Sequence, residues 1–161
     1  MKIFISGIAG FLGSHLADKM ISLNHKVFGC DNLIGGYLDN VPDKAEFHQV
    51  DCNDYSTMLK LTKGIDVIIH CAATAYEGLS VFSPNIVTNN IVGSSVSLIT
   101  ASICNKVKKI VYKHCNVLPI VQALTSIPSW IIYQTPFHTK IVHNNETTKE
   151  IHFLKAGSCA F

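Results

Sequence analysis

A glycine-punctuated segment near the start of the chain, Gly7-Ile8-Ala9-Gly10-Phe11-Leu12-Gly13, constrains the fold more than any other feature. It follows an apolar run typical of a strand and opens a segment with helical spacing. Glycines in this context let the backbone turn tightly, approach a bound pyrophosphate and pack a helix closely on a strand. The first N–H groups of the helix would then face the phosphates. We therefore expect a dinucleotide site that includes Gly7, Gly10, Phe11, Leu12 and Gly13.

Strand and helix patterns alternate from residue 1 to about residue 112, which is typical of a parallel sheet with crossover helices. The expected strands are Lys2–Ser6, Lys26–Cys30, Glu46–Val50, Asp66–His70 and Lys109–Tyr112, and the expected helices are Phe11–Leu23, Asp54–Leu61 and Pro84–Asn105. We predict an α/β fold, a Rossmann-type doubly wound parallel sheet with strand order 3-2-1-4-5, truncated after the fifth strand.

The first and last of these helices are each expected to bury one apolar stripe. The predicted buried residues are Leu12, Leu16, Met20 and Leu23 in the first helix, and Val92, Val96, Ile99 and Ile103 in the last.

An aspartate, Asp31, directly follows the second expected strand. A carboxylate in that place accepts hydrogen bonds from the adenosine ribose hydroxyls and repels a 2′-phosphate. No arginine lies nearby to bind such a phosphate. The pattern therefore favours NAD over NADP, and the alternative is a solvated turn aspartate.

Six motifs follow one another in order along residues 1–112. They are Ser6–Leu16, Asp31-Asn32-Leu33, Asp51, His70-Cys71-Ala72-Ala73, Asn90–Ser94 and Val107–Tyr112. Together they resemble the extended short-chain dehydrogenases, the NAD-dependent epimerase/dehydratase family that includes UDP-glucose 4-epimerase. The spacing of the three glycines, GxxGxxG, also resembles that of short-chain dehydrogenases.

The resemblance implies a set of residues around NAD. It places Asp31, Asn32 and Leu33 at the acidic position and the loop after it, Asp51 and Cys52 near the adenine ring, Cys71, Ala72 and Ala73 along the cofactor, and Asn90 in the following helix.

Three residues of the six motifs, Asp51, His70 and Asn90, have structural alternatives. Asp51 could begin a turn and cap the helix near Asp54. His70 is interpreted as a core histidine with satisfied hydrogen bonds, because the resemblance assigns the cofactor contact to the backbone there. Asn90 could tie its helix to a neighbouring loop.

The resemblance also implies hydride transfer between NAD and a sugar carbon, assisted by a Tyr-x-x-x-Lys pair and a Ser or Thr. None of the tyrosines has a lysine four residues later; they are Tyr37, Tyr55, Tyr76, Tyr112 and Tyr133. Lys113-His114-Cys115-Asn116 stands where a serine-rich segment is expected. No catalytic residue is therefore assigned, and little activity is expected from this chain alone. The alternatives are a non-catalytic NAD-binding module and a non-functional truncated fragment, with a frameshift near Tyr112.

Two regions are expected, an NAD-binding domain over residues 1–112 and an atypical tail over 113–161. The tail contains β-prone apolar runs such as Val117–Val121 and Trp130–Tyr133 but no further strand–helix alternation. It is expected either to cover the sheet edge beside the fifth strand or to pair with another chain.

Composition limits the partners. A net charge of +2 is too small to indicate nucleic acid or an anionic membrane. The most apolar stretch, Val117–Tyr133, is interrupted by Pro119, Gln122, Ser126 and Pro128, so no membrane span is expected. Six cysteines without a CxxC pair indicate reduced, buried thiols rather than a disulfide framework or a metal site. The expected location is cytoplasmic, and the resemblance implies a nucleotide-sugar substrate and allows a homodimer.

Overall fold

A computed structural model describes residues 1–74, 77–112 and 132–133 of the chain. Its elements are β1 (Lys2–Ser6), α1 (Phe11–Ser22), β2 (Lys26–Asp31), η1 (Leu38–Asn40), β3 (Glu46–Gln49), α2 (Tyr55–Leu61), β4 (Val67–His70), α3 (Glu77–Phe82), α4 (Pro84–Thr88), η2 (Asn89–Gly93), α5 (Ser94–Cys104), β5 (Lys109–Tyr112) and β6 (Ile132–Tyr133). The short helix η1 is a 3₁₀ turn, and η2 is a π turn that joins α4 to α5. The predicted strands and long helices are confirmed to within about two residues at their ends, whereas η1 and α3 were not predicted.

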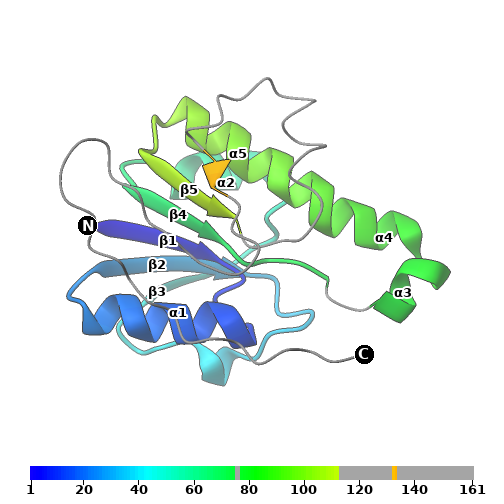
Figure 1. Ribbon diagram of the computed structural model, residues 1–161, viewed down its shortest axis with the longest axis horizontal. Coiled ribbons are helices and arrows are strands. Elements are labelled where there is room, and N and C mark those ends of the chain that lie inside the picture. The colour runs from blue at the N-terminus through cyan, green and yellow to red at the C-terminus, as the bar shows by residue number, and fades with distance from the viewer. Residues whose placement is uncertain (75–76, 113–131, 134–161) are drawn as a thin grey trace.

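The six strands of the described residues lie parallel in one sheet, in the order β3-β2-β1-β4-β5-β6 (Figure 1). The predicted order 3-2-1-4-5 is confirmed. The sheet continues by one short strand, because Ile132 and Tyr133 pair with Ile110 and Val111. These two residues of the predicted tail therefore cover the edge of the fifth strand, and the rest of residues 113–161 lies outside the described residues.

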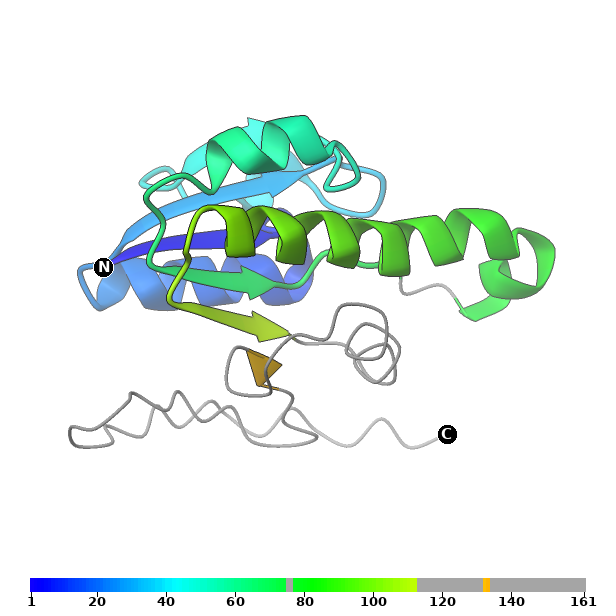
Figure 2. The same ribbon diagram turned by 90° about the horizontal axis from the view of Figure 1, so that it is seen from above.

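The two faces of the sheet carry separate apolar clusters, because side chains alternate along each strand. Phe4, Ile68 and Ile110 face α2 and α5, where they pack with Met58, Leu98 and Ile99. Ile3, Ile5, Val67 and Ile69 face α1 and pack with Ala17 and Met20. Helices thus cover both faces of the sheet (Figure 2), as the doubly wound fold requires.

The predicted apolar stripe of the first helix is wrong at its ends. Leu12 and Leu23 are 37% and 40% exposed. The residues of α1 that are buried are instead Gly13, Ser14, Ala17 and Met20. Small side chains let this helix lie close to the sheet, so its leucines project to the sides rather than inwards.

The predicted stripe of the last helix is wrong except at Ile99. Ile103 is 48% exposed, and Val92 and Val96 are only half-buried. Val96 and Ile103 lie within α5, after the π turn η2, so the error is not one of helical spacing. The predicted stripe includes apolar residues alone, whereas serines are buried in their place. The buried face of α5 is rich in serine, with Ser94, Ser95, Ser97 and Ser102 beside Leu98, Ile99 and Ala101.

Within the described part of the chain, one helical run is long and apolar enough to cross a membrane, Pro84–Cys104. Its second half, α5, packs beside α2 over Ile68 and Ile110. Core helices of globular domains meet the same criteria of length and composition.

Candidate functional site

A pocket of about 240 Å³ lies where the strand order reverses, at the carboxyl ends of β1, β2 and β4. Open parallel sheets bind ligands at such a switch point. Its lining includes ten of the predicted site residues, Gly7, Gly10, Asp31, Asn32, Asp51, Cys52, Cys71, Ala72, Ala73 and Asn90. Four predicted residues, Phe11, Leu12, Gly13 and Leu33, do not line it.

The glycine turn and the end of β4 touch each other through their backbones. Gly7 has a φ of +72°, and a Cβ placed on it would lie 2.7 Å from the Ala72 nitrogen. A Cβ on Gly13 would lie 2.0 Å from the Gly7 carbonyl oxygen. These positions therefore require glycine, for the conformation at Gly7 and for close approach at both.

The first turn of α1 begins beside this contact. Its N-cap residue, Gly10, has no side chain to accept hydrogen bonds from the first N–H groups of the helix, and no acidic residue lies in the first turn. The Phe11 side chain is 81% exposed. Phe11, Leu12 and Gly13 are thus placed at the helix start beside the pocket, where any contribution to binding would come from their N–H groups.

Asp31 joins the end of β2 to the glycine turn. Its carboxylate accepts hydrogen bonds from the Ala9 N–H at 3.1 Å and the Leu33 N–H at 2.8 Å, one on each oxygen. The residue is 8% exposed, so the alternative of a solvated turn aspartate is wrong. Each oxygen keeps a lone pair that can accept a further hydrogen bond.

Asp51 forms a turn in the loop after β3. Its Oδ1 accepts from the Asn53 N–H at 2.8 Å and from Asn53 Nδ2 at 2.9 Å. The cap of α2 is Asp54, whose carboxylate accepts from the Thr57 N–H and whose pKa is lowered by its hydrogen bonds from Thr57 and Ser56. The turn alternative for Asp51 is confirmed and the helix cap is not, while Asp51 and Cys52 both line the pocket.

A row of polar side chains crosses the sheet at its carboxyl end. Ser6, His70 and Tyr112 are register partners on β1, β4 and β5, and all are buried. His70 Nδ1 lies 2.5 Å from Ser6 Oγ, and its Nε2 lies 3.2 Å from Ser95 Oγ on α5. Ser95 also bonds the Tyr112 hydroxyl. We call Ser6, His70, Ser95 and Tyr112 the polar row; it confirms His70 as a core histidine with satisfied hydrogen bonds.

The polar row holds one wall of the pocket in place. Ser6 Oγ accepts from the N–H groups of Cys71 at 3.2 Å and Ala72 at 3.4 Å, both in the pocket wall. The wall is therefore linked through Ser6 and His70 to α5. Burial raises the pKa of Tyr112, and the hydrogen bond with Ser95 partly offsets that rise.

Asn90 lies on the π turn η2 and lines the pocket. Its Nδ2 donates to Thr74 Oγ1 at 2.9 Å, so it ties the helix to the loop after β4, as the structural alternative predicts.

Six further lining residues were not predicted, namely Ile34, Gly35, Gly36, Val50, Thr74 and Ser94. The loop after β2 folds over the glycine turn, where the Tyr37 N–H and Asn40 Nδ2 both donate to the Ala9 carbonyl. A Cβ on Gly36 would lie 2.9 Å from the Ala9 carbonyl carbon. The Gly35-Gly36 pair was the signal that could have identified this loop.

The described part of the chain offers binding groups but no assembled catalytic centre. Tyr112 does not line the pocket. Among residues 1–74, 77–112 and 132–133, no three His, Cys, Asp or Glu side chains gather as metal ligands. Of the four described cysteines, Cys30 and Cys52 are buried as predicted, Cys71 is half-buried, and Cys104 is exposed, contrary to the prediction.

The sequence was compared with known proteins. Residues 3–120 match the sequence model of the NAD dependent epimerase/dehydratase family. The chain is 29% identical over 138 residues to UDP-glucose 4-epimerase of Streptomyces lividans, covering 80% of this chain and 42% of that protein. It is 32% identical over 114 residues to UDP-glucose 4-epimerase of Lacticaseibacillus casei, covering 70% and 34%. The chain spans between 27% and 42% of the length of such curated relatives.

Solved structures give the same result. The fold matches UDP-glucose 4-epimerase of Thermotoga maritima, solved with UDP-glucose, with a TM-score of 0.68 and 32% identity over 70% of this chain and 37% of that one. It matches the Thermus thermophilus enzyme, solved with NAD, with a TM-score of 0.66 and 28% identity over 69% and 36%. The sheet order, the glycine turn and the sequence match agree, and this chain belongs to the NAD dependent epimerase/dehydratase family.

Proposed function

We propose that this chain binds NAD in the pocket at the switch point, as the nucleotide-binding part of a nucleotide-sugar epimerase or dehydratase. The observation that carries the proposal is the backbone contact between Gly7 and Ala72, beside the buried carboxylate of Asp31. A side chain on Gly7 would push apart the two backbone segments that line the pocket at this point.

The pocket fits the two ends of the adenosine diphosphate part of NAD. The uncapped first turn of α1 offers N–H groups and a positive dipole to phosphates. Asp31 offers free lone pairs to ribose hydroxyls. A volume of about 240 Å³ is slightly below the roughly 300–1,000 Å³ of enclosed sites, so an extended dinucleotide would lie in it partly exposed.

The same residues favour NAD over NADP. A 2′-phosphate beside Asp31 would be repelled by the buried carboxylate. An arginine commonly binds that phosphate in NADP enzymes, and all 13 basic residues of this chain are lysines.

NAD, when bound, takes up and returns a hydride. The residues of this chain would hold and orient it, and the polar row would keep the β4 wall in place. The sequence contains no Tyr-x-x-x-Lys pair to move the hydroxyl proton. Because general acid–base catalysis typically supplies about 10²- to 10⁴-fold, we expect little turnover from this chain alone.

A second candidate is a non-catalytic NAD-binding module. The missing Tyr-x-x-x-Lys pair favours it, because binding needs only the residues of the pocket. An assay of UDP-glucose and UDP-galactose interconversion by the NAD-loaded chain separates the two. Turnover supports the enzyme, and tight binding without turnover supports the module.

The test of binding is thermal unfolding with increasing NAD. At 100 times Kd, NAD should add about 2.7 kcal/mol to the free energy of unfolding. Asp31→Asn should weaken NAD binding and reduce its preference over NADP. Asp39→Asn is the matched control, because Asp39 is an exposed acid in the same loop that does not line the pocket. No stabilisation at millimolar NAD would contradict the proposal and leave the non-functional fragment.

A further inference from the structure

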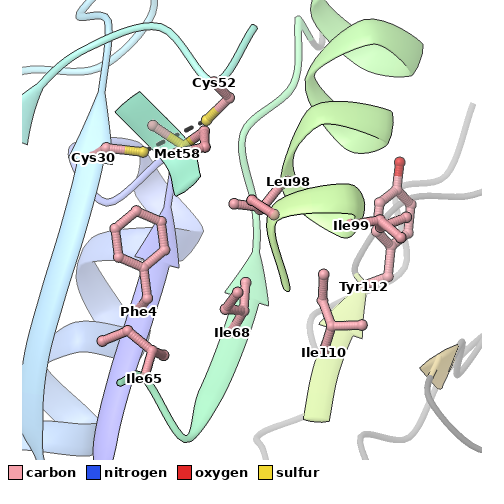
Figure 3. Packing of buried hydrophobic residues seen from close by; sticks show 11 residues of the cluster. Phe4, Cys30, Cys52, Met58, Ile65, Ile68, Leu98, Ile99, Ile110 and Tyr112 are labelled. Carbon is pink, nitrogen blue, oxygen red and sulfur yellow. Dashed lines mark hydrogen bonds between the residues drawn. The ribbon is translucent and has the colours of Figure 1, made fainter. Parts of the chain in front are cut away.

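Two buried thiols lie next to each other at the edge of the pocket. Cys30 and Cys52 are fully and almost fully buried, and their sulfur atoms are 3.5 Å apart (Figure 3). In Figure 3 their side chains point toward one another between β2 and the loop that leads to α2.

The fold itself brings these residues together. Cys30 is the register partner of Ser6, so it extends the line of the polar row onto β2, on the face covered by α2 and α5. Cys52 follows β3, where the chain turns back over the sheet toward α2, and both cysteines belong to one cluster with Met58. Both thiols therefore lie in the interior, where strand register and core packing hold them next to each other.

The pair is closed to bulk solvent on most sides but reaches the pocket. Cys52 contributes to the pocket lining, together with Asp31 and Asp51, which directly follow Cys30 and precede Cys52. A small oxidant that enters the pocket therefore reaches Cys52 first.

We propose that Cys30 and Cys52 form a dithiol that a hydroperoxide oxidises to a disulfide, cross-linking the end of β2 to the loop after β3. The two sulfurs must approach by roughly 1.5 Å, from 3.5 Å to a bond of about 2.05 Å. No other group has to leave the space between the two sulfur atoms for the bond to form.

The reaction balances with one hydroperoxide. The Cys52 thiolate attacks the peroxide oxygen, which gives a sulfenic acid and, with hydrogen peroxide, water as the leaving group. The Cys30 sulfur then attacks the Cys52 sulfur, the S–S bond forms and a second water leaves. Two thiols lose two electrons and two protons in total. Cys52 lines the pocket and Cys30 lies behind it, so Cys52 is the attacking thiol and Cys30 the resolving thiol.

The test uses the whole 161-residue chain, folded and free of NAD, with hydrogen peroxide as the oxidant. Trypsin should release peptides 27–44 and 45–60, each of which contains one cysteine. We expect mass spectrometry to find these two peptides joined after oxidation and separate after reduction with dithiothreitol. Exposed Cys104 serves as an internal standard for the dose of peroxide.

Matched variants keep the result interpretable. In a chain with serine at Cys71, Cys104, Cys115 and Cys159, both remaining thiols should disappear together, and Cys52→Ser in that background should abolish the cross-link. If the substituted chain does not fold, peptide mapping of the unsubstituted chain alone tests whether Cys30 and Cys52 become cross-linked. A folded chain whose Cys104 is oxidised while peptides 27–44 and 45–60 stay separate would overturn the proposal.

A second arm depends on the proposed function. Bound NAD should cover Cys52, so NAD at 100 times Kd should slow cross-linking by up to about 100-fold, the factor by which the free protein is depleted. If thermal unfolding shows no NAD binding, the first arm still stands on its own. Cross-linking at an unchanged rate while NAD is bound would contradict the position of Cys52 in the wall of the NAD site.

Discussion

The two walls of the pocket are built on opposite principles. The glycine turn, residues 7–13, is shaped by the absence of side chains, because Gly7 and Gly13 leave no room for a Cβ. The facing wall, Cys71 and Ala72, is shaped by side chains behind it, since Ser6 and His70 fix its backbone from within the core.

The two walls should therefore respond differently to substitutions. A single methyl group on the glycine turn collides with backbone, which cannot move aside as a flexible side chain can. The β4 wall depends instead on the hydrogen bonds behind it, and it should lose its position when one of them is removed. Substitutions in the two walls can therefore show how much of the pocket's stability depends on close packing and how much depends on buried hydrogen bonds.

The largest effect is expected at the glycine turn. Gly7 and Gly64 have φ values of +72° and +73°, but a Cβ on Gly64 would meet nothing within 4 Å. Gly64→Ala should cost about 1–2 kcal/mol from backbone conformation alone. Gly7→Ala should cost about 1–3 kcal/mol more, because the methyl group collides with Ala72. Urea unfolding of both variants measures the difference, and equal losses would show that crowding at the turn is relieved.

The next effect is expected at the polar row. His70→Leu fills the same place in the core with an apolar side chain but removes one hydrogen-bond partner from each of the Ser6 and Ser95 hydroxyls, so it should destabilise the chain by about 1–3 kcal/mol. His15→Leu, on the exposed side of α1, should change stability by less than about 0.5 kcal/mol.

His70→Leu should also weaken NAD binding in the thermal titration, because the Cys71–Ala72 backbone loses its support. A variant that is destabilised yet binds NAD with unchanged Kd would restrict the polar row to a role in stability.

A smaller effect is expected from the hydroxyl at the outer end of the row. Tyr112→Phe should cost about 1 kcal/mol, since it removes one buried hydrogen bond. The pKa of Tyr112 is raised in the folded state, so its contribution is complete below the ordinary tyrosine pKa of 10.0 and is lost as pH rises through the raised value. The difference in free energy of unfolding between the unsubstituted chain and Tyr112→Phe should therefore be smaller at pH values above 10.0 than at neutral pH. A difference that stays constant would mean that Tyr112 titrates normally.

The smallest effect is expected at the opposite end of the sheet. Asp66, just before β4, accepts from Lys108 Nζ at 2.6 Å, and this bond lowers the pKa of its carboxyl group. The contribution is present above pH 3.8 and is lost as pH falls through the lowered value. Because Lys108 is exposed, Asp66→Asn should cost less than about 1 kcal/mol at neutral pH. Its NAD affinity should be unchanged, and a changed affinity would mean that the two ends of the sheet are coupled.

The strands and the glycine turn could be predicted because each is marked by a short run of neighbouring residues. Gly7, Gly10 and Asp31 lie within or directly after apolar runs with clear spacing, and all three line the pocket. Their contact with NAD stays a prediction. The buried face of α5 could not be predicted in the same way, because it is rich in serine and a search for apolar spacing does not select serines. Gly35 and Gly36 were visible as a pair, but only the folded loop shows that they lie over the glycine turn.

By itself, the sequence determined the parallel sheet, the order of its first five strands, the glycine turn and the absence of a Tyr-x-x-x-Lys pair. The strands and the glycine turn follow from short-range spacing. The strand order follows from the doubly wound fold that they indicate together. Only the tertiary structure decided that Ser6, His70 and Tyr112 form one row and that Cys30 meets Cys52. Such contacts depend on strand register and on packing between distant segments, since a shift of one residue would turn each of these side chains to the other face of the sheet.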